Sequence, residues 1–187
     1  MRIRNWLLLA LLTMGAMLAT ILIQPVTWVQ ATTDDGTRLA CARVDADTPI
    51  TLVFTHSMYG GFVAEDYQLR ADGVLERQRM TTENAAAAEY YATDGQVRAG
   101  DDGYEVIAPP FSTDALAIRV DARGDHRLTI GARTWALYDM LGASTRVTLE
   151  TRRSPRWNVP NGCFAAASQD ITSSRIDLAE NRGIHDR

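Results

Sequence analysis

The sequence contains no lysine, and all 19 of its basic residues are arginine. Schiff-base chemistry, a lysine general base and a Walker-type phosphate loop are therefore excluded. Only three histidines and two cysteines are present, too few for zinc fingers or iron–sulfur clusters, and we expect neither a metal nor a cofactor. A formal net charge of -4 and a pI near 5.3 argue against a nucleic-acid partner.

The chain has 187 residues, a length typical of one domain of ordinary size. The stretch from Trp6 to Ile23 contains no charged residue. As a helix these residues would extend over about 27 Å, close to the thickness of the hydrocarbon core of a bilayer. Two arginines precede the stretch, so we expect the N-terminus in the cytoplasm and the remainder exported. The segment is either an uncut single-pass transmembrane anchor in the inner (cytoplasmic) membrane or a signal peptide. In the second case Val29 and Ala31 suit a cleavage site, and the chain would be released into the periplasm.

The cysteines, Cys41 and Cys163, lie near the two ends of the exported part. In an oxidising compartment such a pair is a candidate disulfide, which would close a long loop and contribute about 4–5 kcal/mol in the chain-entropy model. The alternative is two unpaired thiols.

Short segments with a period of two follow the apolar stretch, separated by turn signals. This pattern predicts an all-β fold, an antiparallel sandwich or barrel of about 8–10 strands. The expected strands are 39–44, 50–59, 62–71, 74–80, 89–92, 104–108, 115–120, 126–130, 133–138 and 146–152. The expected divisions are a signal or anchor over 1–31, a linker over 32–37, a β domain over 38–153 and a polar tail over 154–187.

Two hairpins near the end of the β domain have registers that can be compared with the structure. A three-residue loop at 123–125 would place Val120 opposite Leu128, and a two-residue turn at 131–132 would place Leu128 opposite Trp135. We also expect a turn of helix over 85–88 and a frayed tail, with a short helix over 174–183 as the alternative for the tail.

A histidine and a glutamate flank the pair Gly60-Gly61, which can adopt the positive φ values of a tight turn. A hairpin closed at these glycines places His56 opposite Glu65, inside an otherwise apolar stripe of side chains. The pair is either a register-setting ion pair, a polar centre for binding a ligand or partner together with Tyr59 and Tyr67, or an acid–base centre. In a strand, adjacent side chains point to opposite faces, which disfavours Ser57 as a nucleophile served by His56.

At this hairpin the chain resembles a family known as domain of unknown function eighteen-fifty. Its members carry a His-Ser pair followed some eight residues later by Glu and Tyr. The residues that match this pattern here are His56, Ser57, Val63, Glu65 and Tyr67. The likeness extends over about 38–153, although Tyr59 stands where many members have an acidic residue. It implies an exported β-rich domain behind a hydrophobic helix, with an accessory role beside TRAP-type transporters of the TAXI class. No catalytic activity comes with the resemblance.

We therefore expect a membrane-anchored, non-enzymatic accessory or binding module whose partners are the membrane and transporter subunits. The alternative is a small periplasmic hydrolase that uses His56 with Glu65.

Overall fold

The structure, a computed structural model, describes residues 2–163. Its elements in chain order are α1 (Arg2–Ile23), β1 (Pro25–Thr33), β2 (Arg38–Val44), β3 (Ile50–Thr55), β4 (Phe62–Leu69), β5 (Leu75–Thr82), α2 (Ala85–Tyr91), β6 (Gln96–Gly100), β7 (Gly103–Ile107), β8 (Phe111–Thr113), β9 (Ala115–Val120), β10 (Arg127–Ile130), β11 (Arg133–Ala136), α3 (Leu137–Leu141), β12 (Thr145–Pro155) and the 3₁₀ helix η1 (Arg156–Asn158).

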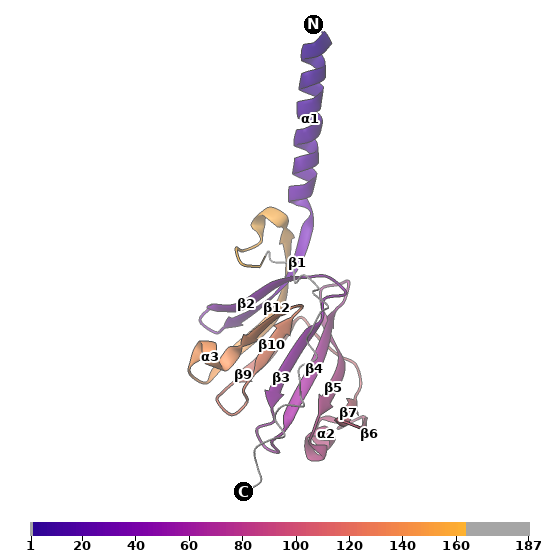
Figure 1. Ribbon diagram of the computed structural model, residues 1–187, viewed down its shortest axis with the longest axis vertical. Helices are drawn as coiled ribbons and strands as arrows, with labels where there is room; N and C mark the ends of the chain where they lie inside the picture. The colour runs from indigo at the N-terminus through magenta and orange to yellow at the C-terminus, as the bar shows by residue number, and fades with distance from the viewer. Residues whose placement is uncertain (1, 164–187) are drawn as a thin grey trace.

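Helix α1 projects from one end of the β domain (Figure 1). It exposes a series of large apolar side chains, namely Trp6, Leu9, Leu11, Leu12, Met14, Met17, Leu18, Ile21, Leu22 and Ile23. Within residues 2–163, no helix meets the requirements of length and apolar character for crossing a membrane. The prediction of a transmembrane segment is therefore not supported.

The strands form two antiparallel sheets, which agrees with the predicted all-β fold. A four-stranded sheet has the order β2-β1-β12-β9, and an eight-stranded sheet has the order β11-β10-β3-β4-β5-β7-β6 with β8 beside β5. Buried side chains from both sheets form the main core between them. Helix α2 packs on a second, smaller apolar cluster that includes Val63 and Met80 of the eight-stranded sheet.

Strand β1 lies inside the four-stranded sheet, paired with β12 over nine residue pairs and with β2 on its other side. Only Gln24 separates it from α1. Val29 and Ala31, the residues that suggested a cleavage site, are fully buried against the other sheet. The β domain thus begins at Pro25, and the predicted boundaries at 31 and 38 are wrong.

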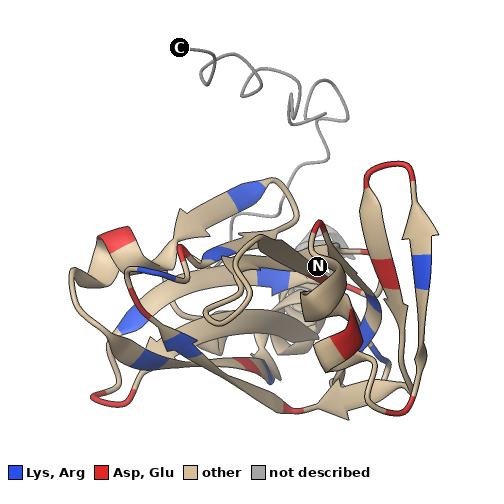
Figure 2. Cartoon of the chain, turned by 90° about the horizontal axis from the view of Figure 1, so that it is seen from below, with Lys and Arg blue, Asp and Glu red and all other residues tan. Residues whose placement is uncertain are grey.

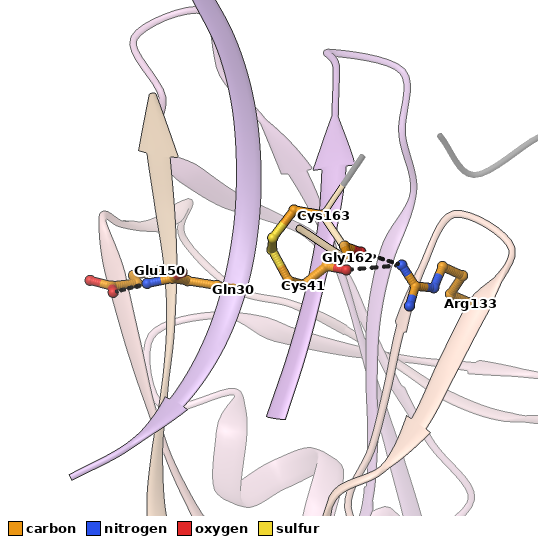
Figure 3. Close-up of a disulfide and its surroundings, with 6 residues drawn as sticks. All are labelled: Gln30, Cys41, Arg133, Glu150, Gly162 and Cys163. Carbon is orange, nitrogen blue, oxygen red and sulfur yellow. Dashed lines mark hydrogen bonds between the residues drawn. A yellow bond between two sulfur atoms is a disulfide. The ribbon is translucent and has the colours of Figure 1, made fainter. Parts of the chain in front are cut away.

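On its outer side β1 packs against the segment that follows β12, and Figure 3 shows the disulfide that joins this segment to β2. A disulfide joins Cys41 of β2 to Cys163, so the candidate pairing is present in the structure. Val26, Trp28 and the two cysteines pack together there with Val159. One Arg133 nitrogen, Nη1, donates to the carbonyl oxygens of Cys41 and Gly162, at 3.1 Å each. The domain therefore continues to Cys163, beyond the predicted boundary at 153, and the helix proposed for 174–183 lies outside the described residues.

Several strand predictions need correction. Strands β1, β6 and β8 were not predicted, and the strand expected at 89–92 belongs to α2. Strand β9 pairs with β12, not with β10, so the predicted contact between Val120 and Leu128 across a hairpin is wrong. The β10–β11 hairpin pairs Leu128 with Trp135, as predicted.

Truncation from the N-terminus tests whether the domain needs β1 in order to fold. A chain that lacks residues 2–24 keeps every strand and should unfold cooperatively, whereas one that lacks residues 2–31 loses most of β1 and should fail to fold. Near-ultraviolet circular dichroism and thermal unfolding would separate the two outcomes. Equal melting temperatures for the two truncated chains would show that β1 is dispensable.

Candidate functional site

The β3–β4 connection is a six-residue loop over 56–61, wider than the two-residue turn predicted at Gly60-Gly61. The last strand pair joins Thr55 to Phe62. Beyond it, the His56 N–H donates to Gly61 O and the Gly60 N–H donates to His56 O, both at 2.9 Å. Both glycines have positive φ, 68° and 74°, as expected.

The wider loop changes the register of the hairpin. Leu52 is opposite Glu65 and Phe54 is opposite Val63, so the predicted pairing of His56 with Glu65 is wrong. The strand face is nevertheless as predicted, since a shift by an even number of positions leaves each side chain on the same side. Glu65 and Tyr67 remain on the inner face, and His56 lies in the loop.

The His56 side chain organises this loop. Its Nδ1 accepts hydrogen bonds from the backbone N–H groups of Met58 and Tyr59, at 3.2 Å each. An accepting Nδ1 carries no proton, so the neutral ring bears its hydrogen on Nε2. Ser57 is also in the loop, and no hydrogen bond between its hydroxyl and His56 occurs in the described part of the chain.

Three tyrosines surround the imidazole, and with it they form what we call the distal aromatic cluster: His56, Tyr59, Tyr90 and Tyr91. The ring centroids of the tyrosines lie 5.1, 5.4 and 5.5 Å from that of His56, in this order. Met58, Tyr59 and Tyr90 are 68, 41 and 54% exposed, whereas His56 is only 6% exposed. The cluster therefore presents an apolar surface around a buried polar ring.

Helix α2 supplies two of these tyrosines, and Asn84 fixes its position. The Asn84 side chain accepts from Ala86 N and Ala87 N at the first turn of the helix, a typical N-cap. Its Nδ2 also donates to Tyr59 O at 2.8 Å, so one residue joins the helix to the β3–β4 loop.

A pocket of about 230 Å³ lies beside the cluster, between the β3–β4 loop and the β9–β10 loop. Its lining includes His56, Tyr91, Asp121 and His126. The His126 ring stacks on Phe54 with centroids 5.5 Å apart. Within residues 2–163, no group of three or more metal-ligating side chains is found.

His126 is buried, and its Nδ1 has no hydrogen-bond partner among the described residues. Burial lowers the pKa of His126 because it penalises the charged ring, while Asp121 and Asp125 act in the opposite direction.

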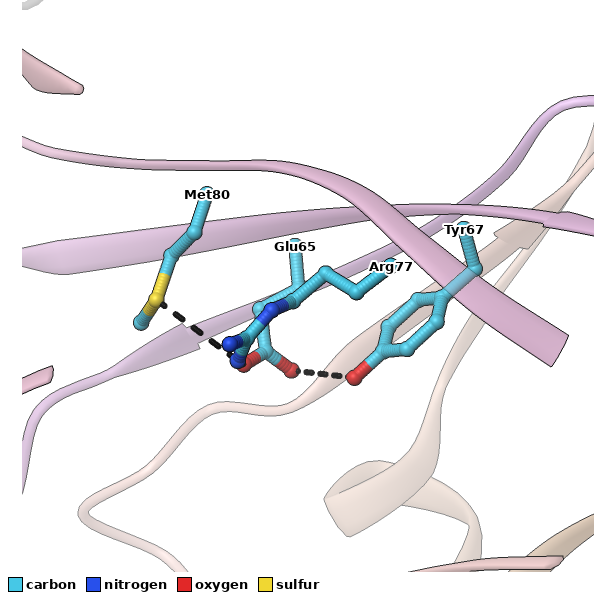
Figure 4. Close-up of polar contacts among 4 residues, drawn as sticks. All are labelled: Glu65, Tyr67, Arg77 and Met80. Atoms are coloured by element: carbon cyan, nitrogen blue, oxygen red, sulfur yellow. Dashed lines mark hydrogen bonds and ion pairs between the residues drawn. The ribbon is translucent and has the colours of Figure 1, made fainter. Parts of the chain in front are cut away.

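Glu65 lies deeper, in a buried polar network that Figure 4 shows. Its two carboxylate oxygens accept from the Tyr67 hydroxyl at 2.8 Å and from Arg77 Nη1 at 3.2 Å. Burial, and then the negative charge of Glu65, raise the pKa of Tyr67 far above its ordinary value. The phenol therefore stays protonated and serves as a hydrogen-bond donor to the carboxylate.

A β-bulge turns Arg77 toward this network. Asp66 pairs with Arg79 but Tyr67 pairs with Arg77, so one residue of β5 is left out of the ladder. Leu75 and Arg77 point inward before the bulge, and Met80 does so after it. The change of period between Leu75 and Met80 is the sequence signal that could have identified Arg77.

Tyr91 lies between the two groups. Its ring meets His56 edge-on, while burial and then the charge of Glu65 raise its pKa to about 12. The structure thus brings His56 together with Tyr59 and Glu65 together with Tyr67, but it separates the two pairs. Tyr90, Tyr91, Arg77 and His126 belong to this region and were not identified from the sequence.

Comparisons with protein-family models, with curated proteins and with solved structures find no match for this chain. The resemblance to the family of unknown function therefore stays a prediction.

Two arginines of β5 provide a matched test of the network. Arg77 is largely buried beside Glu65, whereas Arg79 makes an exposed ion pair with Asp66 at 3.4 Å. Arg77→Ala should lower the free energy of unfolding by about 3–5 kcal/mol because it leaves a buried carboxylate without its cation. Arg79→Ala should cost about 0–1 kcal/mol. Urea denaturation measures both, and similar costs for the two variants would contradict the proposed burial of the Glu65 charge.

His126 should make the domain sensitive to acid. Its folded pKa lies below the unfolded value of 6.5, so the unfolded chain binds the proton more readily and stability falls as the pH drops below about 6.5. His126→Gln should reduce the loss of unfolding free energy between about pH 7.5 and pH 5. An unchanged pH profile in this variant would show that other groups carry the acid sensitivity.

Proposed function

We propose that this protein is an exported, non-enzymatic binding module that α1 holds at a membrane and that presents the distal aromatic cluster to a partner. In line with the family resemblance, the proposed partner is a subunit of a TRAP-type transporter of the TAXI class, to which the protein would be an accessory. The observation that carries the proposal is that α1 lies at one end of the molecule, while α2 and the β3–β4 loop, which carry the cluster, lie at the other (Figure 1).

The apolar surface of α1 supports attachment to lipid. The exposed apolar side chains of α1 lie close together along one helix. Soluble proteins rarely expose large contiguous apolar patches, and such patches mark protein or membrane contacts. Because β1 follows α1 after one residue and lies inside a sheet, removal of the helix at the suggested site would also remove a core strand. We infer that α1 stays with the domain and attaches it to the outer side of the cytoplasmic membrane.

The disulfide between Cys41 and Cys163 supports export. Disulfides persist in oxidising compartments such as the periplasm and are rare in the cytosol.

The distal aromatic cluster supports a binding role. Tyrosines are enriched at the centres of protein interfaces because they bury a large, rigid surface and keep a polar group. The alternative, a hydrolase built on His56, requires a nucleophile within hydrogen-bond reach of the imidazole. In the described residues the hydrogen bonds to His56 side-chain atoms come from backbone N–H groups, and Glu65 is engaged by Tyr67 and Arg77.

Membrane fractionation and crosslinking test the proposal together. The full chain should stay in the membrane fraction after a high-salt wash, because apolar contacts with lipid are not weakened by salt, and a chain lacking residues 2–24 should be released. Co-expressed TAXI-type transporter subunits should crosslink to the full chain, and the double variant Tyr59→Ser/Tyr90→Ser should lose most of this crosslinking. Trp157→Ser is the matched control, because Trp157 is an even more exposed aromatic residue that lies outside the cluster, in η1.

Release of the full chain by the wash would contradict membrane attachment. Crosslinking that survives the double tyrosine variant, or that Trp157→Ser reduces equally, would contradict a role for the cluster.

A further inference from the structure

The outer face of the four-stranded sheet is strongly basic, although the chain as a whole is acidic. By strand alternation and cross-strand pairing, its outward positions include five arginines and one acidic residue. These residues are Arg38, Arg43, Arg119, Arg146, Arg152 and Glu150. The loops at the end opposite α1, by contrast, carry several acidic residues (Figure 2).

Two of these arginines lie directly opposite each other, Arg119 on the edge strand β9 and Arg146 on β12. Side chains at such positions start about 4.5–5.5 Å apart, and like charges there are destabilising. Arg152 of the same strand has a carboxylate partner, since its Nη2 lies 2.8 Å from Glu150. No ion pair with a carboxylate is found for Arg119 or Arg146 in the described residues. Within the part of the chain that the structure describes, these two adjacent positive charges have no counter-charge.

The two arginines also line a cavity of about 460 Å³, together with Ser144, Thr145 and neighbouring residues of β9. No acidic side chain contributes to its lining. The Thr145 hydroxyl donates to Ala143 O at 3.4 Å, so Ser144 is the residue whose hydroxyl is available as a further donor. The cavity therefore offers donors from two guanidinium groups and a hydroxyl, which require an acceptor-rich anion.

We propose that this cavity binds a phosphoryl group, held between Arg119 and Arg146. Each guanidinium can donate two parallel hydrogen bonds to an oxyanion, and a tetrahedral phosphoryl group has enough oxygens to accept from both. Binding would supply the missing counter-charge and relieve the repulsion across the strand pair.

The position in the fold favours a small soluble phosphoryl compound over a lipid headgroup. Pro155, at the other end of β12, pairs with Pro25 next to α1. Arg146 lies nine residues earlier in the same strand, a separation of about 30 Å at the usual rise per residue. The cavity is therefore remote from the helix that we propose to attach to lipid.

Titration with inorganic phosphate tests the site on the full chain in detergent. At constant ionic strength, phosphate should shift the NMR Nε–Hε signals of Arg119 and Arg146. Either Arg119→Gln or Arg146→Gln should weaken binding by about tenfold or more, because each removes one charged fork. Arg38→Gln, on the same sheet face but outside the cavity, should leave the affinity unchanged.

Stability without phosphate gives a second readout. Arg146→Gln removes a like-charge contact, so it should not lower the melting temperature in phosphate-free buffer, and it should abolish the stabilisation that phosphate produces. Signal shifts spread over all exposed arginines, or an equal loss of affinity in Arg38→Gln, would overturn the site. Shifts of the Arg119 and Arg146 signals on addition of vesicles containing phosphatidylglycerol, but not on addition of free phosphate, would assign the anion to lipid and contradict the soluble compound.

Discussion

The pairing of β1 with β12 is the interaction on which the rest of the structure depends. It joins the first strand of the domain to the last over nine residue pairs and so brings the two ends of the described fold together. Val29 and Ala31 face the main core, while Trp28 packs under the segment that Cys163 holds in place. Because β1 is covered on both faces, its direction is fixed. The direction of β1 in turn sets α1 at one end of the sandwich and the distal aromatic cluster at the other.

Val29 and Ala31 also explain why the prediction from the sequence placed the start of the domain too late. A small residue at Ala31 and Val29 two positions before it are typical of a signal-peptidase site. Small residues are also what a sheet needs where it lies close to another sheet, and Ala31, Ala40 and Ala42 are all buried at the main core. A signal-peptidase site and a closely packed strand can therefore have the same local composition. Only the long-range pairing with β12, from the far end of the chain, distinguishes a buried strand from a cleavable segment.

The candidate site shows how far alternation alone can carry a prediction. Strand alternation depends on local sequence, and it correctly placed Glu65 and Tyr67 on the inner face. Register depends on loop geometry, and the Gly60-Gly61 pair allowed a two-residue turn as readily as the six-residue loop that forms. The hydrogen bonds from the loop backbone to His56 Nδ1 stabilise the longer loop, and they place the imidazole among tyrosines of α2. Those tyrosines are separated from His56 by two strands, so sequence proximity could not reveal the contact.

The Glu65 network connects the register of the sheet to the cluster. Arg77 reaches Glu65 only because a bulge changes which residues of β5 point inward, and an inward arginine without a carboxylate would leave a buried charge unpaired. The ion pair thus favours the bulged register over the regular one, in which Gln78 would replace Arg77. The ring of Tyr91 contacts His56, and burial together with the negative charge of Glu65 raises the pKa of Tyr91. Since α2 packs against Met80 of β5, a shift in the register of β5 would move the side chains that α2 contacts. The buried pair therefore helps to position the exposed tyrosines of the distal aromatic cluster, although it does not belong to that cluster.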